Sequence, residues 1–293
     1  MHARRVLILA TVIVALAATS VAAQGHGNAY GRGRSNPSPT TAASSISTAS
    51  STGNAVAVRQ FGAWLDDASL LEPGHGWASL SVGHSRSLGA QQFDFPVIDA
   101  GMRLNRRAQF GGTLPYYRLH FTDGTGVGGV GDLYLNLKYS LRDPEKSRNK
   151  VGVAVAPLVE VLSQPDPATG GRFSWAVPVS VELRGSDYRV YGSAGYFSRG
   201  AIFSSGAVEV PVTNRLVVTG ALIQMRSIND NPAADALGLP KNRRDVAGAA
   251  AYFLRPSIAV FGSIGRTISQ AGPLGTSLML TGGVSMTFAG ISP

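Results

Sequence analysis

The sequence predicts an all-β protein: a transmembrane antiparallel β-barrel of about twelve strands, preceded by a disordered N-terminal segment. Three observations lead to this prediction. Strand-length stretches alternate apolar and polar residues, their connections are alternately short and long, and the chain begins with a secretory leader. A tilted strand of about ten residues crosses the hydrocarbon core of a membrane, and stretches of this length recur between Gly76 and Phe288.

The N-terminus has the features of a signal peptide. Arg4 and Arg5 precede an apolar run, Val6 to Ala18, that is shorter than the ~20 residues of a membrane-spanning helix. Small residues at Val21-Ala22-Ala23 suit cleavage by a signal peptidase. We expect residues 1–23 to be removed on export, with a membrane anchor as the alternative.

The next segment differs in composition from the rest of the chain. Residues 24–54 consist largely of Gly, Ser, Thr, Ala and Pro, and such a stretch buries too little apolar surface to offset its chain entropy. We expect a disordered linker there, a periplasmic lead-in segment over residues 55–75, a barrel over 76–288 and a C-terminal tail over 289–293.

The strands are expected over residues 76–88, 93–104, 108–121, 131–142, 151–162, 172–184, 188–198, 200–212, 215–226, 244–255, 257–268 and 276–288. In the stretch 172–184 one parity is apolar and the other carries Ser, Ala, Glu and Arg; the apolar residues are Phe173, Trp175, Val177, Val179, Val181 and Leu183. A soluble sandwich also alternates. Small residues and scattered charges on the polar parity suit a barrel whose inside faces water.

The connections support the barrel independently. Short polar links occur at residues 105–107, 143–150, 185–187, 213–214 and 256, and between them stand mostly longer ones, such as TDGTGVGGV and SINDNPAADALGLPKNRR. Outer-membrane barrels have short periplasmic turns and longer external loops. A sandwich has no reason to sort its loops by length.

A glycine motif requires a separate test. Gly126, Gly128 and Gly131 have the G-x-G-x-x-G spacing of a dinucleotide-binding loop, which must open a helix. Here the residues after Gly131 alternate with a period of two, from Leu133 to Leu141. The motif therefore predicts a glycine-rich turn followed by a strand.

Parity also predicts which residues face the lumen. The charged and polar candidates carry both signs, so we expect pairs that stiffen the barrel, with a role in selectivity as the alternative; they are Asp99, Arg103, Arg118, His120, Lys138, Glu160, Glu182 and Glu209. Lys138, Glu160 and Glu182 fall on neighbouring strands and are expected to pair across the sheet. Their neighbours Leu137, Val159 and Val181 are expected to face lipid.

Evidence for catalysis is weak in the sequence. Only His84 and His120 fall on expected strands, in no recognisable Ser-His-acid arrangement, and no cluster of residues suggests a metal ion or cofactor. We expect no enzyme, and keep a lipid-modifying enzyme as the weakest alternative. Lys241, Arg243 and Arg244 end the longest loop, where they either contact lipopolysaccharide phosphates or are simply solvated.

The net charge and the absence of cysteine limit which partners are expected. The formal net charge is +9 at pH 7 and there is no cysteine, so an exported form has no disulfides. For an envelope protein a basic surface favours phosphorylated lipid over nucleic acid. We expect contacts with outer-membrane lipid and lipopolysaccharide, with the barrel-assembly machinery and with a small-molecule solute, and none with nucleic acid.

The run LPYYRLHFTDGTGVGGVGDLYLNLKYSL, residues 114–141, resembles a motif of the outer-membrane barrel family named for the MetA pathway of phenol degradation. The matching features are Leu114-Pro115-Tyr116, Asp123-Gly124, Gly129-Val130-Gly131-Asp132 and Lys138-Tyr139, and residues 70–84 resemble that family's first strand. The resemblance implies a barrel that passes small hydrophobic molecules, without catalytic residues.

The last strand also resembles an assembly signal, since Gly283, Met286 and Phe288 alternate toward a terminal aromatic residue, although AGISP follows. Together these features predict a passive channel or transporter for a small solute in the bacterial outer membrane. The alternative is a structural or adhesive barrel whose lumen is filled by side chains.

Overall fold

The structure is a computed structural model that describes residues 45–47, 57–59, 65–87, 89–163, 171–198, 200–228, 242–269 and 276–289. In that part of the chain we find no helix long and apolar enough to cross a membrane.

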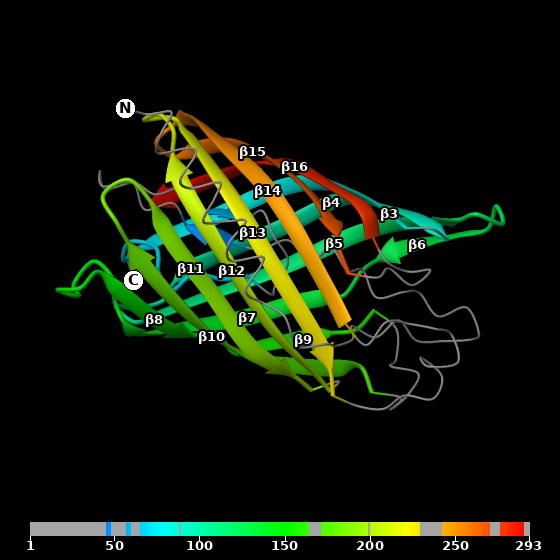
Figure 1. The fold of residues 1–293 in the computed structure, drawn as a ribbon, viewed down its shortest axis with the longest axis horizontal. Coiled ribbons are helices and arrows are strands. Elements are labelled where there is room, and N and C mark those ends of the chain that lie inside the picture. The colour runs from blue at the N-terminus through cyan, green and yellow to red at the C-terminus, as the bar shows by residue number, and fades with distance from the viewer. Residues whose placement is uncertain are drawn as a thin grey trace.

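Antiparallel strands make up the described structure (Figure 1). The large sheet contains β3 (His75–Ser87), β4 (Ala90–Arg103), β5 (Ala108–Phe121), β6 (Gly126–Val130), β7 (Leu133–Arg142), β8 (Val151–Val155), β9 (Leu158–Val161), β10 (Phe173–Arg184), β11 (Arg189–Phe197), β12 (Ala201–Pro211), β13 (Leu216–Ser227), β14 (Asn242–Arg255), β15 (Ile258–Thr267) and β16 (Thr276–Ala289). Two short strands, β1 (Ser45–Ser47) and β2 (Ala57–Arg59), pair with each other, and β2 lies beside β16 and β3.

The large sheet closes on itself. Its open order runs from β6 through β5, β4, β3 and β16 round to β7 and β9, and the further pairing of β5 with β7 joins the two ends. Both β6 and β7 pair with β5, and both β8 and β9 pair with β10, so each of these couples forms one interrupted wall strand. The wall therefore has twelve strands, which confirms the predicted fold.

The two ends of the barrel differ. At one end, here called the turn end, lie the connections 104–107, 143–150, 185–188, 212–215 and 256–257, together with the start of β3 and the finish of β16. The opposite end, here called the loop end, carries the other connections; Figure 1 shows it on the right.

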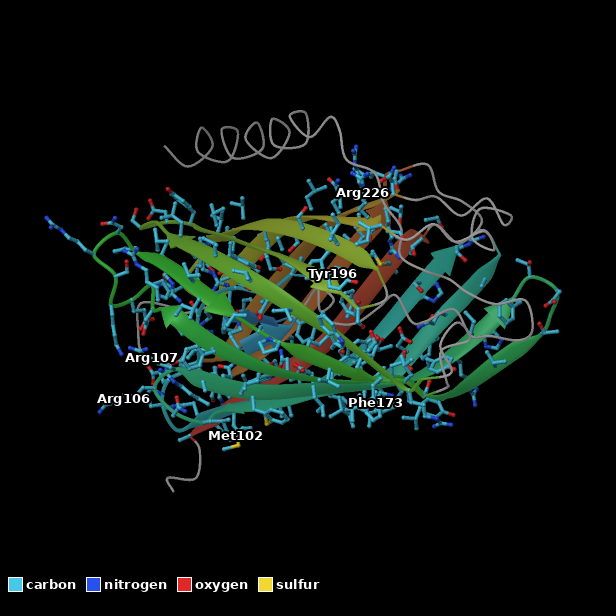
Figure 2. All side chains as sticks on the ribbon, turned by 90° about the horizontal axis from the view of Figure 1, so that it is seen from below. Met102, Arg106, Arg107, Phe173, Tyr196 and Arg226 are labelled. Carbon is cyan, nitrogen blue, oxygen red and sulfur yellow. The ribbon has the colours of Figure 1, made fainter. Side chains whose placement is uncertain are left out.

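The outer face of the wall is apolar. On β10, the residues predicted to face lipid are exposed at 42–74% and alternate with buried residues. Leu137, Val159 and Val181 are likewise exposed, at 42%, 43% and 50%. Phe173 and Met102 project outward in Figure 2. An exposed apolar surface that encircles a closed sheet is what a lipid environment requires.

A tryptophan anchors β3 to the lumen side. Trp77 is 1% exposed, and its indole Nε1 donates to Asp99 Oδ2 at 2.8 Å. Thr113 Oγ1 donates to the other carboxylate oxygen at 2.9 Å. The ring lies over Gly101 of β4, where any Cβ would overlap it, so only glycine lets this indole pack against the wall.

The glycine motif lies on a strand, not in a turn. Gly126–Val130 forms β6 and pairs with Tyr116–His120 of β5. The expected loop TDGTGVGGV therefore shrinks to a tight connection near Asp123 and Gly124, where Gly124 has φ of 84°. The prediction of a turn over the motif was wrong in position. The conclusion that no phosphate-binding helix follows holds, because β7 does.

Parts of the predicted organisation lie outside the described residues. This applies to the signal peptide over 1–23 and to all of the linker over 24–54 except β1. The tail is described only at Ala289, which ends β16.

Candidate functional site in the barrel lumen

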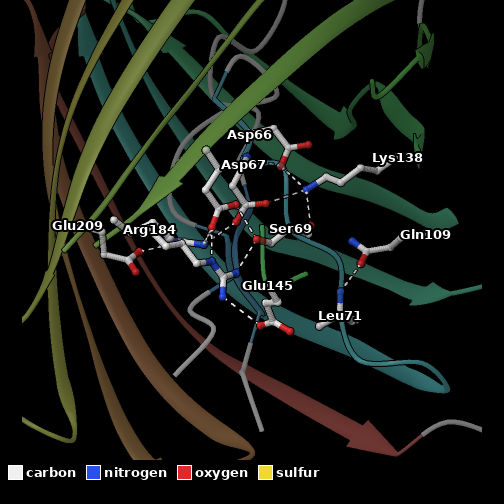
Figure 3. Close-up of polar contacts among 11 residues, drawn as sticks. Asp66, Asp67, Ser69, Leu71, Gln109, Lys138, Glu145, Arg184 and Glu209 are labelled. Carbon is white, nitrogen blue, oxygen red and sulfur yellow. Dashed lines mark hydrogen bonds and ion pairs between the residues drawn. The ribbon is translucent and has the colours of Figure 1, made fainter. Parts of the chain in front are cut away.

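A segment of chain that precedes the first wall strand occupies the lumen. We call residues 65–71 the lumen segment. Leu65, Asp67 and Ala68 are completely buried, at 0% exposure, although they belong to no strand. These residues fall within the stretch 55–75 that was expected to be a periplasmic lead-in, and the structure places them inside the barrel. Figure 3 shows the segment surrounded by side chains of the wall.

Two consecutive aspartates hold the middle of the segment. Lys138 of β7 donates through Nζ to Asp66 Oδ1 at 2.7 Å and to Asp67 Oδ1 at 2.9 Å. Arg189 of β11 donates through Nη1 to Asp67 Oδ2 at 2.9 Å. The Asp67 carboxylate is therefore paired with cations from two separate parts of the wall.

The cations are themselves shared with wall carboxylates. Arg189 Nη2 donates to Glu209 Oε2 of β12 at 3.0 Å, and its guanidinium lies 4.7 Å from the ring centroid of Tyr191. Glu182 of β10 accepts from Ser69 Oγ at 2.5 Å and from Arg184 Nε at 2.6 Å. Charges buried in this way are tolerated only when they are paired and hydrogen-bonded.

The segment crosses the lumen from one wall to another. Leu65 packs with Tyr191, Ala207 and Ala249 of β11, β12 and β14. At the other end, the Leu71 N–H donates to Gln109 Oε1 of β5 at 2.9 Å, and Arg103 of β4 donates to the Leu71 carbonyl. A backbone stretch without strand pairing has its polar groups satisfied by the barrel interior.

The network lies in the half of the lumen nearer the turn end. Arg103 ends β4, Arg184 ends β10 and Arg189 starts β11, and all three flank turns at that end. The network thus joins the lumen segment to the wall in this cross-section of the barrel.

The other half of the lumen is lined differently. A buried cluster joins inward residues of β7 and of β9 through β13, and consists of Tyr134, Leu158, Ala176, Phe197, Ala201, Phe203 and Met225. The Phe197 and Phe203 rings meet edge to face, with centroids 6.3 Å apart. The lumen toward the loop end therefore has an aromatic, apolar cluster on one part of its wall, alongside buried acidic residues such as Asp94, Glu160 and Asp245.

Most of the predicted lumen residues lie on the inner face. The six that are at most 9% exposed are Asp99, Arg103, Lys138, Glu160, Glu182 and Glu209. The expected pairing among Lys138, Glu160 and Glu182 is replaced in part, because Lys138 contacts the lumen segment.

Arg118 and His120 were placed on the wrong face. Both are exposed, and register sets Arg118 beside Phe93, which is 45% exposed. The alternation of β5 continues unbroken, but its polarity inverts toward the loop end: Tyr117 and Leu119 point inward, at 4% and 3% exposure. Beyond the hydrocarbon layer the outer face of the wall has polar surroundings, so a polar side chain there no longer indicates the lumen-facing side of the strand.

The predicted lumen residues did not include several members of the network. Arg189 shares the parity of Ser193 and opposes the outward Val190, so alternation on β11 alone was enough to find it. Asp66 and Asp67 belong to a stretch without periodicity, and no sequence signal indicated that they bind inside the barrel.

Among the described residues, no group of three or more His, Cys, Asp or Glu side chains is arranged to hold a metal ion. His84 and His120 both face outward, away from the lumen network. In the basic trio 241–244, Lys241 lies outside the described residues. Arg243 bonds through Nε to Asp245 on the inner face, and Arg244 takes the outward parity.

Comparison with known proteins places the fold. The chain is similar to the COG4313 outer membrane channel from Pseudomonas putida F1, with 14% identity and a TM-score of 0.61 over 76% of this chain and 98% of that one. It is also similar to the NanC porin, with 11% identity and a TM-score of 0.53 over 71% and 98% of the two chains. No family model and no curated protein matches the sequence. The chain has the fold of outer-membrane β-barrels.

Proposed function

We propose that this protein is a passive channel for a small solute in the bacterial outer membrane. One observation carries the proposal: a chain segment, residues 65–71, is buried inside the closed barrel near the turn end and is held there by wall side chains. A segment held by side-chain contacts can leave without breaking any wall pairing, whereas a barrel filled by its own wall side chains has no such route.

The lining suggests the kind of solute. An aromatic and apolar surface toward the loop end suits a molecule with a hydrophobic body, in the way that ligand pockets are apolar with few polar groups. Similarity to a channel and a porin supports a channel. The resemblance of residues 114–141 to a barrel family associated with phenol degradation supports a small hydrophobic solute.

The test uses the refolded mature chain in planar bilayers. We expect a small conductance from the wild type and a larger one from a variant in which residues 65–71 are replaced by an equally long Gly-Ser segment. Heat-modifiable gel migration of both proteins checks that the barrel has formed. Absence of conductance from both folded proteins would overturn the channel and favour a structural barrel.

Uptake of a small aromatic fluorophore into proteoliposomes tests the solute class. Phe203→Ser, in the apolar cluster, is expected to slow this uptake more than it changes ion conductance, because the segment that limits ions is untouched. Equal uptake by wild type and variant would contradict the hydrophobic route.

A further inference from the structure

The outer wall carries a cluster of cations near the loop end. We call His84, Arg86, Arg118 and His120 the β3–β5 patch. Arg86, Arg118 and His120 are exposed and His84 is half-buried, and all four alternate with inward residues on β3 and β5. None of them takes part in the lumen network.

Strand register places the four side chains next to one another. Across β3, β4 and β5, one row reads Arg86, Gln91, His120, because Arg86 pairs with Gln91 and Gln91 with His120. The next row toward the turn end reads His84, Phe93, Arg118. Neighbouring strands lie about 4.8 Å apart, so the long arginine side chains of β3 and β5 can reach one ligand that lies over β4.

The patch has no acidic partner on the wall. Every Asp and Glu of the described barrel strands is buried: Asp94, Asp99, Glu160, Glu182, Glu209 and Asp245. In the β5–β6 turn, Asp123 accepts from Thr125 Oγ1 at 2.6 Å and from the Thr125 N–H at 2.9 Å. The outward arginines are thus available to an external anion.

The patch lies where the apolar band ends. On β5 the outward residues nearer the turn end are Phe110, Leu114 and Tyr116, and Arg118 and His120 follow them. On β3, Leu80 and Val82 precede His84 and Arg86 in the same way. Phe93, 45% exposed, stands in the centre of the patch. A ligand there meets cations at its head and apolar surface along its body.

We propose that the β3–β5 patch binds the phosphorylated headgroup of a lipopolysaccharide-type lipid, with its acyl chains along the apolar wall below. This inference rests on the outer-membrane location in the proposed function but not on channel activity. Two arginines separated by one strand match a headgroup with two phosphates on a disaccharide better than a glycerophospholipid with one. Guanidinium groups bind phosphate through paired N–H donors.

Further outward arginines occur along the wall beyond β16. Arg226, Arg244 and Arg266 point outward near the loop ends of β13, β14 and β15. Figure 2 shows Arg226 on the outside of the barrel, far from Arg106 and Arg107 of a connection at the turn end. Cations at this level of the wall therefore surround more than one side of the barrel, as a layer of anionic headgroups requires.

The experiment measures lipid binding to the full mature chain in detergent by native mass spectrometry. The probes are diphosphoryl lipid A, its fully dephosphorylated form and phosphatidylglycerol. We expect the wild type to retain diphosphoryl lipid A. The double variant Arg86→Gln/Arg118→Gln should weaken its binding roughly tenfold to thirtyfold, since each cation contributes modestly at a lipid surface. Arg255→Gln, an exposed arginine at the turn end of β14, is the matched control and should leave binding unchanged.

Three outcomes would overturn the proposal. The first is that the double variant binds diphosphoryl lipid A as tightly as the wild type does. The others are that the wild type binds the dephosphorylated lipid, or phosphatidylglycerol, as tightly as it binds diphosphoryl lipid A. Heat-modifiable migration and far-UV circular dichroism of the double variant confirm that it has folded. Conductance in bilayers without lipid A should match the wild type, so a failure of the channel and a failure of the lipid site are seen in separate measurements.

Discussion

Replacing Lys138 by methionine tests how the lumen segment is held. Methionine keeps the volume of the lysine stem but removes the ammonium group that contacts Asp66, Asp67 and the Ser69 carbonyl, at 2.7, 2.9 and 3.3 Å. The side chains of Lys138 and Asp67 are 3% and 0% exposed. In the variant, the carboxylates of Asp66 and Asp67 remain buried but have lost the cation that they share.

The magnitude follows from this burial. Removing one partner of a buried ion pair destabilises by about 3–5 kcal/mol, and about 1.4 kcal/mol corresponds to a factor of ten. The equilibrium between the docked and released states of the lumen segment should therefore shift toward release by roughly a hundredfold to a few thousandfold. Wall pairing is unaffected, because Lys138 contributes its side chain and not its backbone to these contacts.

The assay combines single-channel recording with limited proteolysis. Lys138→Met should spend more time in a high-conductance state and should be cut within residues 65–71 sooner than the wild type. Adding Asp66→Asn should partly restore docking by removing the unmatched charge. Lys146→Met, an exposed lysine 3.7 Å from Asp143 in a turn, is the control and should behave as the wild type.

A folded Lys138→Met protein with wild-type conductance and wild-type resistance to protease would refute the reasoning. It would mean that the lumen segment is held by its backbone and apolar contacts, such as those of Leu65, and that the ion pairs are incidental to docking.

Three further predictions concern the wall and the β5–β6 turn. Val181→Arg should impair membrane insertion, because an arginine facing lipid near the midplane costs about 2–4 kcal/mol, whereas Glu182→Gln should insert and change ion selectivity or leak; the reverse pattern in a refolding gel would show that the inner and outer faces of β10 were exchanged. Gly101→Ala should lower the folded yield because a Cβ there overlaps the Trp77 ring, while Gly206→Ala, with open space around its Cβ position, should fold normally; equal yields would show that the indole moves at little cost. The hydrogen bonds from the Thr125 hydroxyl and backbone lower the pKa of Asp123, so Thr125→Val should raise the Asp123 pKa toward its ordinary value in an NMR titration, and an unchanged titration would exclude the hydroxyl as the cause.

The alternation along each strand was enough to predict the barrel. Residues of one parity on β10 had to be apolar because they face lipid, and those of the other had to be small or polar because they face the lumen. This rule is local and depends only on the period of a strand, so strand positions, strand number and lipid-facing residues such as Val181 followed from the sequence.

The same rule failed where its physical basis ends. At the loop end of β5 the outer face leaves the hydrocarbon, so Arg118 and His120 could be polar on the outside while Tyr117 and Leu119 packed within. The alternation of apolar and polar side chains also could not show that Gly126–Val130 pairs as a strand, because a glycine has no side chain that marks one face of the strand as apolar or polar.

Only the tertiary structure revealed the lumen segment. Asp66 and Asp67 meet Lys138 and Arg189 across 72 and 122 residues of chain, respectively. These cations come together only when β7 and β11 close into one wall. A stretch without periodicity does not indicate which residues it will contact, because its position depends on a lumen that other parts of the chain form. The sequence by itself determined the wall of this protein, and barrel closure decided what fills it.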